Sequence, residues 1–573
     1  MNLKKLFRCV SSPIFIILVI GAIVRICGIN FGLPHTGARP DESDIVQIAL
    51  RFGLGDLNPH WFMYPSLYMY VLFVLYAIYY LLGRFFGVFS SSISFMISGV
   101  SDPTNLYLID RFLSAAMGIA TIYIVYKLCR YLFNKNVAIL ASLFLSLSYL
   151  HVRDSHFGVT DITMTFFVMC SIYFIVKCLE NDSLVNYAVA GIFGGLTTSI
   201  KYPGGMVMLP LLMTYFINSV NSFKTREYRK IFINNKLFTI FGVFFASFIL
   251  GTPYSIFDFK AFIRDVFMMG SKIETGHGTA VIRGWLYHSM FSLPIGMGSL
   301  HLLFGLAGMA TCLLWNRAEL NRAKASILFV FPVAYYLFFG SSHAVFLRYI
   351  IPVVPFICIG AAYFVCFLNE RYFKHMIFVI IIAIIIMCPS IYRIFQFDSL
   401  LLKKDNRLVA AEWVERNIKD GSSIGSTCSE YGDIKYYPRI DKLYELLDAT
   451  SNDMKRKEII SAINFFRAKN TKRFDLCVYD KNRKVFYIKN KNNIILPKYI
   501  ITESSPLIQY SITPANIQEL IKTRYDLIQS FVVSDVNERS IFYNQQDAFY
   551  LPYSGFKNID RPGPNLFVYE RIK

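Results

Sequence analysis

The sequence predicts a polytopic α-helical membrane protein of about eleven spans, with re-entrant or juxtamembrane helices in its first outer loop, followed by a soluble α/β domain. Three observations support this fold class. The chain of 573 residues is 55% hydrophobic, with 53 Phe and 37 Tyr, well above a globular average. Apolar runs of roughly 15–21 residues recur up to residue 393. From residue 394 onward no such run remains, and Lys, Asn and Asp become more frequent.

The first apolar run, 13–31, follows Lys4, Lys5 and Arg8. Basic residues next to a span favour the cytoplasmic side, so we expect the N-terminus inside. The run is long enough to stay in the membrane as an anchor instead of being cleaved as a signal. Most of the net charge of +20 likewise lies between apolar runs, which indicates membrane topology and not nucleic-acid binding.

The same rule sets the remaining topology. Ten further spans are predicted near 111–131, 137–151, 162–179, 185–200, 204–219, 236–252, 295–315, 325–340, 348–367 and 375–393. Their inward loops contain Lys127, Arg130 and Lys135; Lys177; Lys224, Arg226, Arg229, Lys230 and Lys236; Arg317, Arg322 and Lys324; and Arg371 and Lys374. The C-terminus is then outside, and 32–110 is a long outer loop. We therefore expect the apolar stretch 66–86 to be a tilted or re-entrant helix, unless 87–101 brings the chain back.

These boundaries predict a membrane domain over 1–393 and an outer α/β domain over 394–573. Asp405 is placed to cap a helix whose apolar face is Leu408, Ala411, Val414 and Ile418. Strands are predicted at Phe474–Tyr479, Lys484–Ile488, Tyr499–Thr502, Tyr525–Val533 and Leu566–Tyr569. The eleven cysteines show no metal-ligand spacing. Only Cys428 and Cys477 lie in the outer domain, where the sequence permits but does not indicate a disulfide.

Several charged residues lie at the predicted membrane boundary on the outer side. Arg39, Asp41 and Glu42 follow the first span, and Asp161 opens another. Lys201 lies where Pro and Gly interrupt two short apolar runs, and Arg348 lies at the outer end of a span. Charge is costly near a bilayer and usually faces water, protein or a substrate. Broken helices at membrane depth often line binding sites.

Carboxylates with separate cations suit sugar transfer from a lipid phosphate. An attacking hydroxyl needs a carboxylate to take its proton, and the departing phosphate needs fixed cations, a role open to Lys201 and Arg348. Simpler explanations stay open at this point. Asp41 and Glu42 are also explained by the membrane boundary, and Lys201 and Arg348 by contact with lipid headgroups. Asp161 could cap its helix, and His156 could be a structural hydrogen-bonding residue. Asp154 is most simply paired with Arg153.

The order of these motifs resembles the GT-C glycosyltransferases. The motifs are the acidic pair, Tyr64-Pro65-Ser66-Leu67-Tyr68, Asp110-Arg111-Phe112-Leu113-Ser114-Ala115, His156-Phe157 with Thr160-Asp161, Lys201-Tyr202-Pro203, and Arg348-Tyr349-Ile350-Ile351-Pro352. The nearest group is family 39-like, related to protein O-mannosyltransferases and the lipid A aminoarabinose transferase. The likeness covers the membrane part and the start of the outer domain. Relatives often have Thr-Lys-Gly-Pro in the third motif, where this chain has Ile200-Lys201-Tyr202-Pro203.

The resemblance implies a polyprenyl- or dolichyl-phosphate sugar donor, inversion at the anomeric carbon and an outer-loop Asp as the base. Carried over by position, Asp41 is the base with Glu42 beside it, and Asp161 is the second acidic position. We expect Lys201, Arg348 and Arg39 to bind the donor phosphate. We expect His156, Tyr64, Tyr202 and Tyr349 to contact the substrates.

The sequence therefore predicts a membrane glycosyltransferase that moves a sugar from a lipid phosphate to a lipid, glycan or protein acceptor. We expect it in a bacterial inner (plasma) membrane, with its site and outer domain facing outward. The alternatives are a transporter or lipid-handling protein without transferase activity, and a non-catalytic scaffold. Against a transporter, no two halves resemble each other, and the charges gather at one face. The sugar, the acceptor and the use of a divalent metal are left open.

Overall fold

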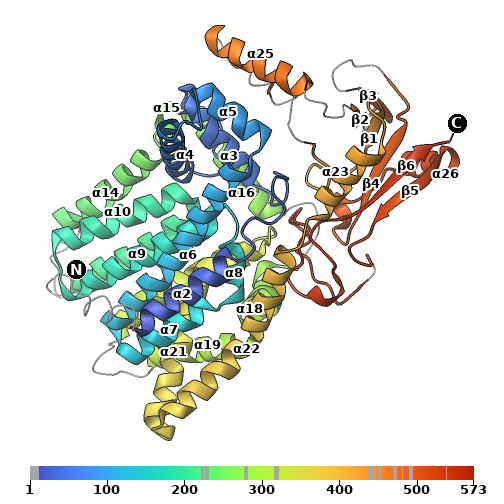
Figure 1. Cartoon of the computed structure of the whole chain (residues 1–573). Helices are drawn as coiled ribbons and strands as arrows, with labels where there is room; N and C mark the ends of the chain where they lie inside the picture. The colour runs from blue at the N-terminus through green and yellow to red at the C-terminus, as the bar shows by residue number, and fades with distance from the viewer. Residues whose placement is uncertain are drawn as a thin grey trace. The chain divides into compact units, whose positions relative to one another are not determined.

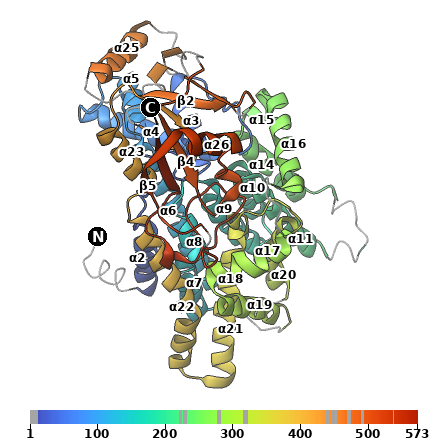
Figure 2. The same ribbon diagram turned by 90° about the vertical axis from the view of Figure 1, so that its right-hand side faces the viewer.

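The computed structural model describes residues 12–220, 225, 232–276, 282–314, 322–436, 443–444, 447–448, 453–468, 474–480, 482–488, 494–536 and 538–572. The chain divides into two compact units. Unit 1 comprises residues 1–29, 54–73 and 110–396, and unit 2 comprises 30–53, 74–109 and 397–573. The predicted boundary after residue 393 lies near the last break, but unit 2 also takes two pieces of the first outer loop. Figures 1 and 2 show the elements of each unit.

Unit 1 is helical. Its elements are α2 (Pro13–Ile26), α7 (Lys135–Ser146), α8 (Tyr149–Asp154), α9 (Thr160–Glu180), α10 (Leu184–Ile200), η2 (Tyr202–Val207), α11 (Met208–Asn218), α14 (Asn235–Gly251), α15 (Tyr254–Phe257), α16 (Phe259–Thr275), α17 (Gly284–Tyr287), η3 (His288–Ser292), α18 (Leu293–Met297), α19 (Ser299–Leu314), α20 (Arg322–Gly340), η4 (Leu347–Val353), α21 (Val354–Leu368) and η5 (Asn369–Phe373). Three helices contribute to both units: α4 (Leu67–Phe85), α6 (Thr104–Leu132) and α22 (Met376–Leu401).

Small residues set the closest helix contacts in unit 1. Helix α10 lies between α9 and α14, as Figure 1 shows. A Cβ at Gly195 of α10 would lie 2.2 Å from the carbonyl oxygen of Phe244 in α14. Helices α19 and α21 meet in the same way, because a Cβ at Gly308 would lie 1.8 Å from the carbonyl oxygen of Gly360. Such close backbone approach is typical of helices packed in a membrane.

Six described helices are long and apolar enough to cross a membrane, or seven if the bent pair Gly284–Met297 and Ser299–Leu314 forms one span. One of the six is α4, so its predicted re-entrant course stays a prediction. Shorter apolar helices occupy four other predicted spans, namely Pro13–Ile26, Lys135–Ser146, Leu184–Ile200 and Asn235–Gly251. The count of eleven spans is therefore unconfirmed.

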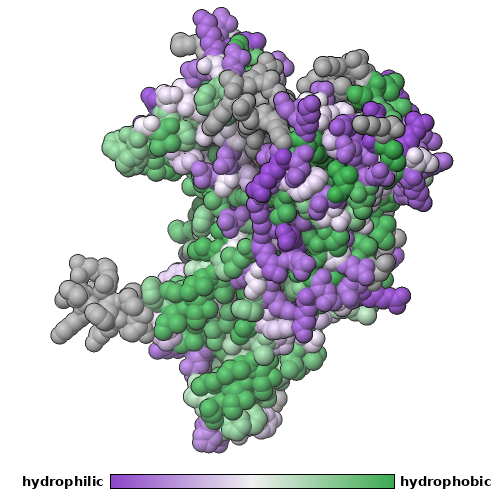
Figure 3. All heavy atoms as spheres, turned by 45° about the vertical axis from the view of Figure 1, so that its right-hand side comes forward, coloured by the Kyte–Doolittle hydropathy of each residue, from purple (hydrophilic) through white to green (hydrophobic). Residues whose placement is uncertain are grey.

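Exposed apolar side chains cover part of the surface of the long helices. Helix α22 exposes Ile380, Ile381, Ile384 and Ile385. Figure 3 shows hydrophobic side chains over the α21–α22 hairpin, the lowest part of the molecule in each view. Eight of the basic residues used for the topology lie outside the described residues: Lys4, Lys5, Arg8, Lys224, Arg226, Arg229, Lys230 and Arg317. The orientation stays a prediction.

Unit 2 combines helices from residues 30–53 and 74–109 with the C-terminal domain. Its helices are α3 (Glu42–Arg51), η1 (Phe52–Leu54, whose last residue belongs to unit 1), α5 (Ser92–Ser101), α23 (Asn406–Asn417), α25 (Asp453–Ala468), η6 (Ile508–Tyr510), α26 (Ala515–Arg524) and η7 (Phe556–Asn558). Its strands are β1 (Ser423–Ser426), β2 (Asp475–Asp480), β3 (Val485–Ile488), β4 (Tyr499–Ser504), β5 (Tyr525–Phe531) and β6 (Asn565–Arg571).

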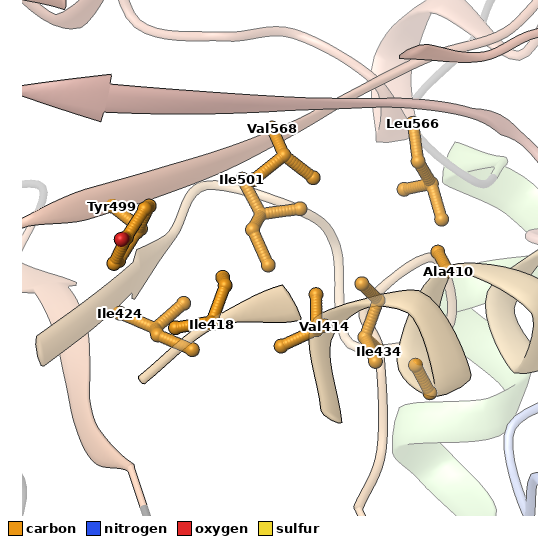
Figure 4. Packing of buried hydrophobic residues seen from close by; sticks show 10 residues of the cluster. Ala410, Val414, Ile418, Ile424, Ile434, Tyr499, Ile501, Leu566 and Val568 are labelled. Carbon is orange, nitrogen blue, oxygen red and sulfur yellow. The ribbon is translucent and has the colours of Figure 1, made fainter. Parts of the chain in front are cut away.

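The described strands form one sheet in the order β3-β2-β1-β4-β6-β5. Strand β1 runs parallel to β2 and β4, and the other pairs are antiparallel. Helix α23 packs Ala410, Val414 and Ile418 on one face, against Ile501 and Val568 (Figure 4). Ile500 points to the opposite face, because neighbouring side chains in a strand alternate, and packs with Ile517 of α26.

These elements confirm that the C-terminal part is an α/β domain; its place on the outer face, from which we name it the outer domain, stays a prediction. All five predicted strands are present, and the side chain of Asp405 caps α23 by accepting a hydrogen bond from the Arg407 amide. Strand β1 was not predicted. Cys428 and Cys477 are free thiols, so the disulfide that the sequence permits is not formed.

Candidate active site

Three charged residues from different elements of unit 1 meet in one buried cluster. Asp161 lies in the first turn of α9, Lys201 lies between α10 and η2, and Arg348 lies in η4. The Lys201 ammonium donates to Asp161 Oδ1 at 2.6 Å. Arg348 Nε lies 3.9 Å from the other oxygen of the same carboxylate, Oδ2. The sequence placed all three at one boundary, and the structure brings them together.

The local sequence explains why Lys201 is available there. Helix α10 ends at Ile200, and Lys201 adopts an extended backbone with φ −156° and ψ 129°. The 3-10 helix η2 then begins at Tyr202, and Pro203 lies in its first turn, where the missing amide hydrogen of proline costs no helical hydrogen bond. Gly204 is required at this turn, since a Cβ there would lie 2.8 Å from the carbonyl oxygen of Thr197. The break between the helices directs the lysine toward α9.

Aromatic rings flank the cluster. The Lys201 ammonium lies 5.0 Å from the ring centroid of Tyr349 and 5.6 Å from that of Tyr64. Both distances fall in the range of cation–π attraction, which is stronger in a site with little water. The Tyr202 hydroxyl donates instead to the carbonyl oxygen of Phe62, at 2.9 Å. Tyr64 and Tyr349 thus border the cluster, whereas the Tyr202 hydroxyl is engaged in a backbone contact.

The cluster is deeply buried. Asp161 is 1% exposed, Arg348 5% and Lys201 6%. Lys201 and Arg348 carry ammonium and guanidinium groups, the cations that form charge-assisted hydrogen bonds to phosphate oxygens.

The structure shows the contacts of Asp154 and His156, for which the sequence suggested structural roles. Arg153 donates to Asp154 at 2.9 Å, which confirms the local ion pair. The ring nitrogens of His156 lie 3.0 Å from the carbonyl oxygen of Val152 and 2.9 Å from that of Cys27. The explanation of Asp161 as a side-chain helix cap does not hold, because the N-terminus of α9 has no side-chain cap and the carboxylate binds Lys201.

Asp110, in the sequence motif Asp110-Arg111, is a further buried acid, and it was assigned no role from the sequence. The Tyr68 hydroxyl donates to Asp110 Oδ1 at 2.7 Å, and Asp110 is fully buried. A Cβ at Gly158 would lie 2.0 Å from the Asp110 carboxylate, so only glycine fits beside it. The only signal for this contact was the resemblance, which covers both motifs.

The acidic pair lies in unit 2. Asp41 has a positive φ of 74°, uncommon for any residue but glycine, and immediately precedes α3. Glu42 is the first residue of α3 and is fully buried. Arg39 donates to Asp547 at 2.9 Å, and both side chains are buried. The predicted phosphate contact of Arg39 stays a prediction.

Across the described residues, no three His, Cys, Asp or Glu side chains lie together as a metal ion would require. The use of a divalent metal therefore stays open, as it was from the sequence.

Residues 89–250 match the family described as dolichyl-phosphate-mannose-protein mannosyltransferase. This range includes Asp161 and Lys201. Over this range the chain is similar to the GT-C glycosyltransferases. The apolar helices and this family identify an integral membrane protein. A comparison with curated proteins found no match to the chain.

Solved structures of GT-C proteins are similar to the chain at low sequence identity. The apo oligosaccharyltransferase of Archaeoglobus fulgidus is 12% identical with a TM-score of 0.50, over 98% of this chain and 88% of that chain. This similarity shows a shared fold. ArnT from Cupriavidus metallidurans bound to undecaprenyl phosphate is 16% identical with a TM-score of 0.46, over 70% of this chain and 72% of that one. AglB from Archaeoglobus fulgidus, in complex with an inhibitory peptide and a dolichol-phosphate, is 12% identical with a TM-score of 0.48, over 88% and 70%.

Proposed function

We propose that the protein is an inverting glycosyltransferase that acts at the outer face of its membrane. It moves a sugar from a polyprenyl-phosphate or dolichyl-phosphate donor to a lipid, glycan or protein acceptor. The observation that carries this proposal is the buried cluster in which Lys201 and Arg348, from two different elements, both approach the carboxylate of Asp161. The family description, which names a dolichyl-phosphate-linked sugar, supports the donor class.

In this proposal Lys201 and Arg348 bind the donor phosphate. Ammonium and guanidinium groups form strong charge-assisted hydrogen bonds to phosphate oxygens. Charge on the phosphate grows as the bond to the sugar breaks, so fixed cations stabilise the transition state more than the ground state. Asp161 holds Lys201 in place through its 2.6 Å contact and keeps the cluster from repelling itself.

The reaction is a single displacement. The acceptor oxygen or nitrogen attacks the anomeric carbon as the bond to the phosphate oxygen breaks, and the electron pair of that bond leaves with the lipid phosphate. Asp41 takes the acceptor proton, and Glu42 tunes its neighbour. Because attack and departure occur on opposite sides, the anomeric configuration inverts. Leaving phosphate is stable without a proton, so no second acid is needed, unlike in a two-carboxylate hydrolase.

The remaining predicted residues take supporting roles in the proposal. The rings of Tyr64 and Tyr349 border the phosphate and the first sugar atoms. Tyr202 and His156 fix the surrounding backbone through their carbonyl contacts, and so shape the substrate site.

Release of free polyprenyl phosphate tests this function without knowledge of the acceptor. Membranes from the protein's own cells, with the protein overproduced, are given polyprenyl-phosphate-linked hexoses and pentoses in turn. We expect release above the background of membranes lacking the protein for at least one donor, with an equal amount of sugar appearing in an acceptor. A transporter or lipid-handling protein would move the donor and release none. Absence of release with every donor would contradict the proposal.

Variants then locate the phosphate site. Lys201→Ala should weaken binding of undecaprenyl phosphate as well as turnover, because the lysine meets the phosphate before and during the reaction. Lys236→Ala is the matched control, since Lys236 also pairs with an aspartate, Asp182, but on a more exposed surface. Equal phosphate binding by the two variants would remove Lys201 from the site.

A further inference from the structure

We propose that the outer domain positions the base, by clamping the segment before Asp41 with Asp547, Phe549 and Arg407. This inference rests on the proposed function of Asp41. It assigns Arg39 to the clamp, in place of the phosphate contact predicted from the sequence. The outer domain thereby becomes part of the catalytic apparatus of the proposed transferase, beyond any part in acceptor selection.

The backbone at Asp41 requires such support. Its φ of 74° and ψ of −30° fall in a region that side-chain-bearing residues rarely adopt. A strained conformation persists only where the surrounding structure holds it, and such residues cluster at functional sites. Without external contacts this residue would relax to a commoner conformation and turn its carboxylate to another direction.

The first contact of the clamp is made by Arg39, two residues before Asp41. Its guanidinium donates to Asp547 Oδ2 at 2.9 Å and lies 4.6 Å from the ring centroid of Phe549. Arg39 is 1% exposed, Phe549 2% and Asp547 6%. A buried ion pair beside an aromatic face admits few alternative geometries, so it fixes the position of Arg39.

The second contact is made by Arg407 in the first turn of α23. Its guanidinium binds both oxygens of Asp405, at 2.8 and 2.6 Å. The same side chain donates to the carbonyl oxygen of Gly37 at 3.2 Å and to that of Tyr431 at 2.5 Å. Arg407 therefore joins the segment before Asp41 to the loop after β1, while Asp405 fixes its own orientation.

His35 adds a third contact. Its Nε2 donates to the carbonyl oxygen of Asp433 at 2.7 Å, and its Nδ1 accepts from the Gly37 amide at 3.2 Å. Burial, and then the charges of Arg407 and Lys435, hold the pKa of His35 well below its ordinary value. The neutral ring keeps one donor and one acceptor, which is the pattern that these two contacts use.

The clamp is itself attached to the sheet. Tyr550, next to Phe549, donates to Glu503 of β4 at 3.0 Å and lies 2.6 Å from the Ser429 hydroxyl. The position of the segment around Asp547 is therefore set by the central strands of the outer domain. Movement of this sheet would be transmitted through Asp547 and Arg39 to Asp41.

The expected signature is a loss of turnover without a loss of donor binding. The proposed phosphate ligands Lys201 and Arg348 belong to unit 1, whereas every clamp residue belongs to unit 2. Loosening the clamp misdirects the base, which acts in the chemical step, whereas the donor phosphate is bound before that step. Misplacement of a reacting group by about 1 Å can cost on the order of 100-fold in rate.

The test uses the full chain in detergent or native membranes. Asp547→Asn should lower kcat by roughly 10–100-fold with little change in donor KM. It should also speed hydrogen exchange of backbone amides in residues 36–45. Asp547→Glu keeps the carboxylate and should restore most of both properties. Glu412→Gln, which removes a half-exposed partner of Lys404, is the matched control and should change neither.

The exchange measurement separates failure of this inference from failure of the proposed function. If Asp41→Asn proves fully active, the base is wrongly assigned, but exchange in Asp547→Asn still shows whether the clamp exists. If Asp547→Asn does not fold, Phe549→Leu removes only the ring under Arg39 and is judged by the same two measurements. Unchanged exchange together with unchanged kcat would overturn the clamp. A raised donor KM at unchanged kcat would instead show that Arg39 serves donor binding.

Discussion

At the scale of single residues, the stability of unit 1 depends on pairing its buried charges with charges of opposite sign. Asp161 is held by Lys201 and lies near Arg348, in a position where an isolated carboxylate would be very costly. The same three residues were selected from the sequence because each lies at a predicted membrane boundary. Their identity was therefore predictable, but the direct contact between Lys201 and Asp161 was not.

Removing the lysine charge should destabilise the protein as well as impair donor binding. Lys201→Met leaves Asp161 buried with one cation fewer, and loss of one partner of a buried pair costs about 3–5 kcal/mol. We expect a clear fall in the thermal unfolding temperature in detergent. Lys236→Met breaks a more exposed pair, worth at most about 1 kcal/mol, and should shift it little. Equal shifts for the two variants would contradict the buried-cluster account.

Glu503 makes outer-domain stability depend on pH. Burial raises the pKa of Glu503 to about 7, although hydrogen bonds from Ser429 and Tyr550 oppose the shift. Between its unfolded pKa near 4.5 and about 7, the unfolded state ionises first. Stability from this group is therefore complete below about pH 4.5 and is lost as pH rises through 7. The difference amounts to about 3 kcal/mol.

This effect is measured by unfolding the full chain at a series of pH values from 4.5 to 8. Signals from the outer domain report its free energy of unfolding at each pH. Glu503→Gln should flatten the profile between pH 4.5 and 7, because the amide does not titrate. Glu570→Gln is the control, as this carboxylate lies on the neighbouring β6 but is only partly buried. An equally steep fall in the Glu503→Gln variant would assign the pH dependence to another group.

At the scale of elements, close helix contacts rest on glycines. Gly308→Ala would place a methyl group 1.8 Å from the Gly360 carbonyl oxygen, so α19 and α21 must separate. Overpacking of this kind costs about 1–3 kcal/mol. The control is Gly242→Ala in α14, where an added Cβ meets nothing within 4 Å. Thermal unfolding should show a loss for Gly308→Ala and no loss for Gly242→Ala, and the reverse order would contradict this packing.

The outer-domain elements show what the sequence pattern can and cannot reveal. Apolar runs such as Tyr499–Thr502 predicted five strands, and Asp405 predicted the start of α23. Strand β1 escaped because Ser423-Ile424-Gly425-Ser426 contains one large apolar side chain. It lies between two parallel neighbours, β2 and β4, so its strand conformation is imposed by the sheet.

At the scale of the whole molecule, contacts between residues far apart in the chain could not be predicted from the sequence. Arg39 and Asp547 are separated by 508 positions, and no periodicity or motif connects them. From the sequence alone, Arg39 was therefore assigned to phosphate binding, and the outer domain was treated as a separate piece. Its inclusion in one compact unit with residues 30–53 follows only from the fold.

The orientation of the chain gives a whole-molecule prediction. Reporter fusions after Lys135, Lys230, Arg322 and Lys374 should report the cytoplasm, because basic loops stay inside. A fusion at Lys573 should report the outer side. A cytoplasmic C-terminus would place the outer domain, with the clamp on Asp41, on the wrong face for the proposed reaction.

The most direct test of the central claim is single-turnover transfer by Asp41→Asn, with donor binding measured on the same preparation. Asparagine keeps the size of the side chain and tolerates positive φ, so the backbone should be preserved while the basicity is lost. We predict normal donor binding and a transfer rate lower by at least roughly 10²–10⁴-fold, with a smaller loss in Glu42→Gln. Near wild-type transfer by Asp41→Asn, with Glu42→Gln or Asp161→Asn inactive, would show that another carboxylate is the base.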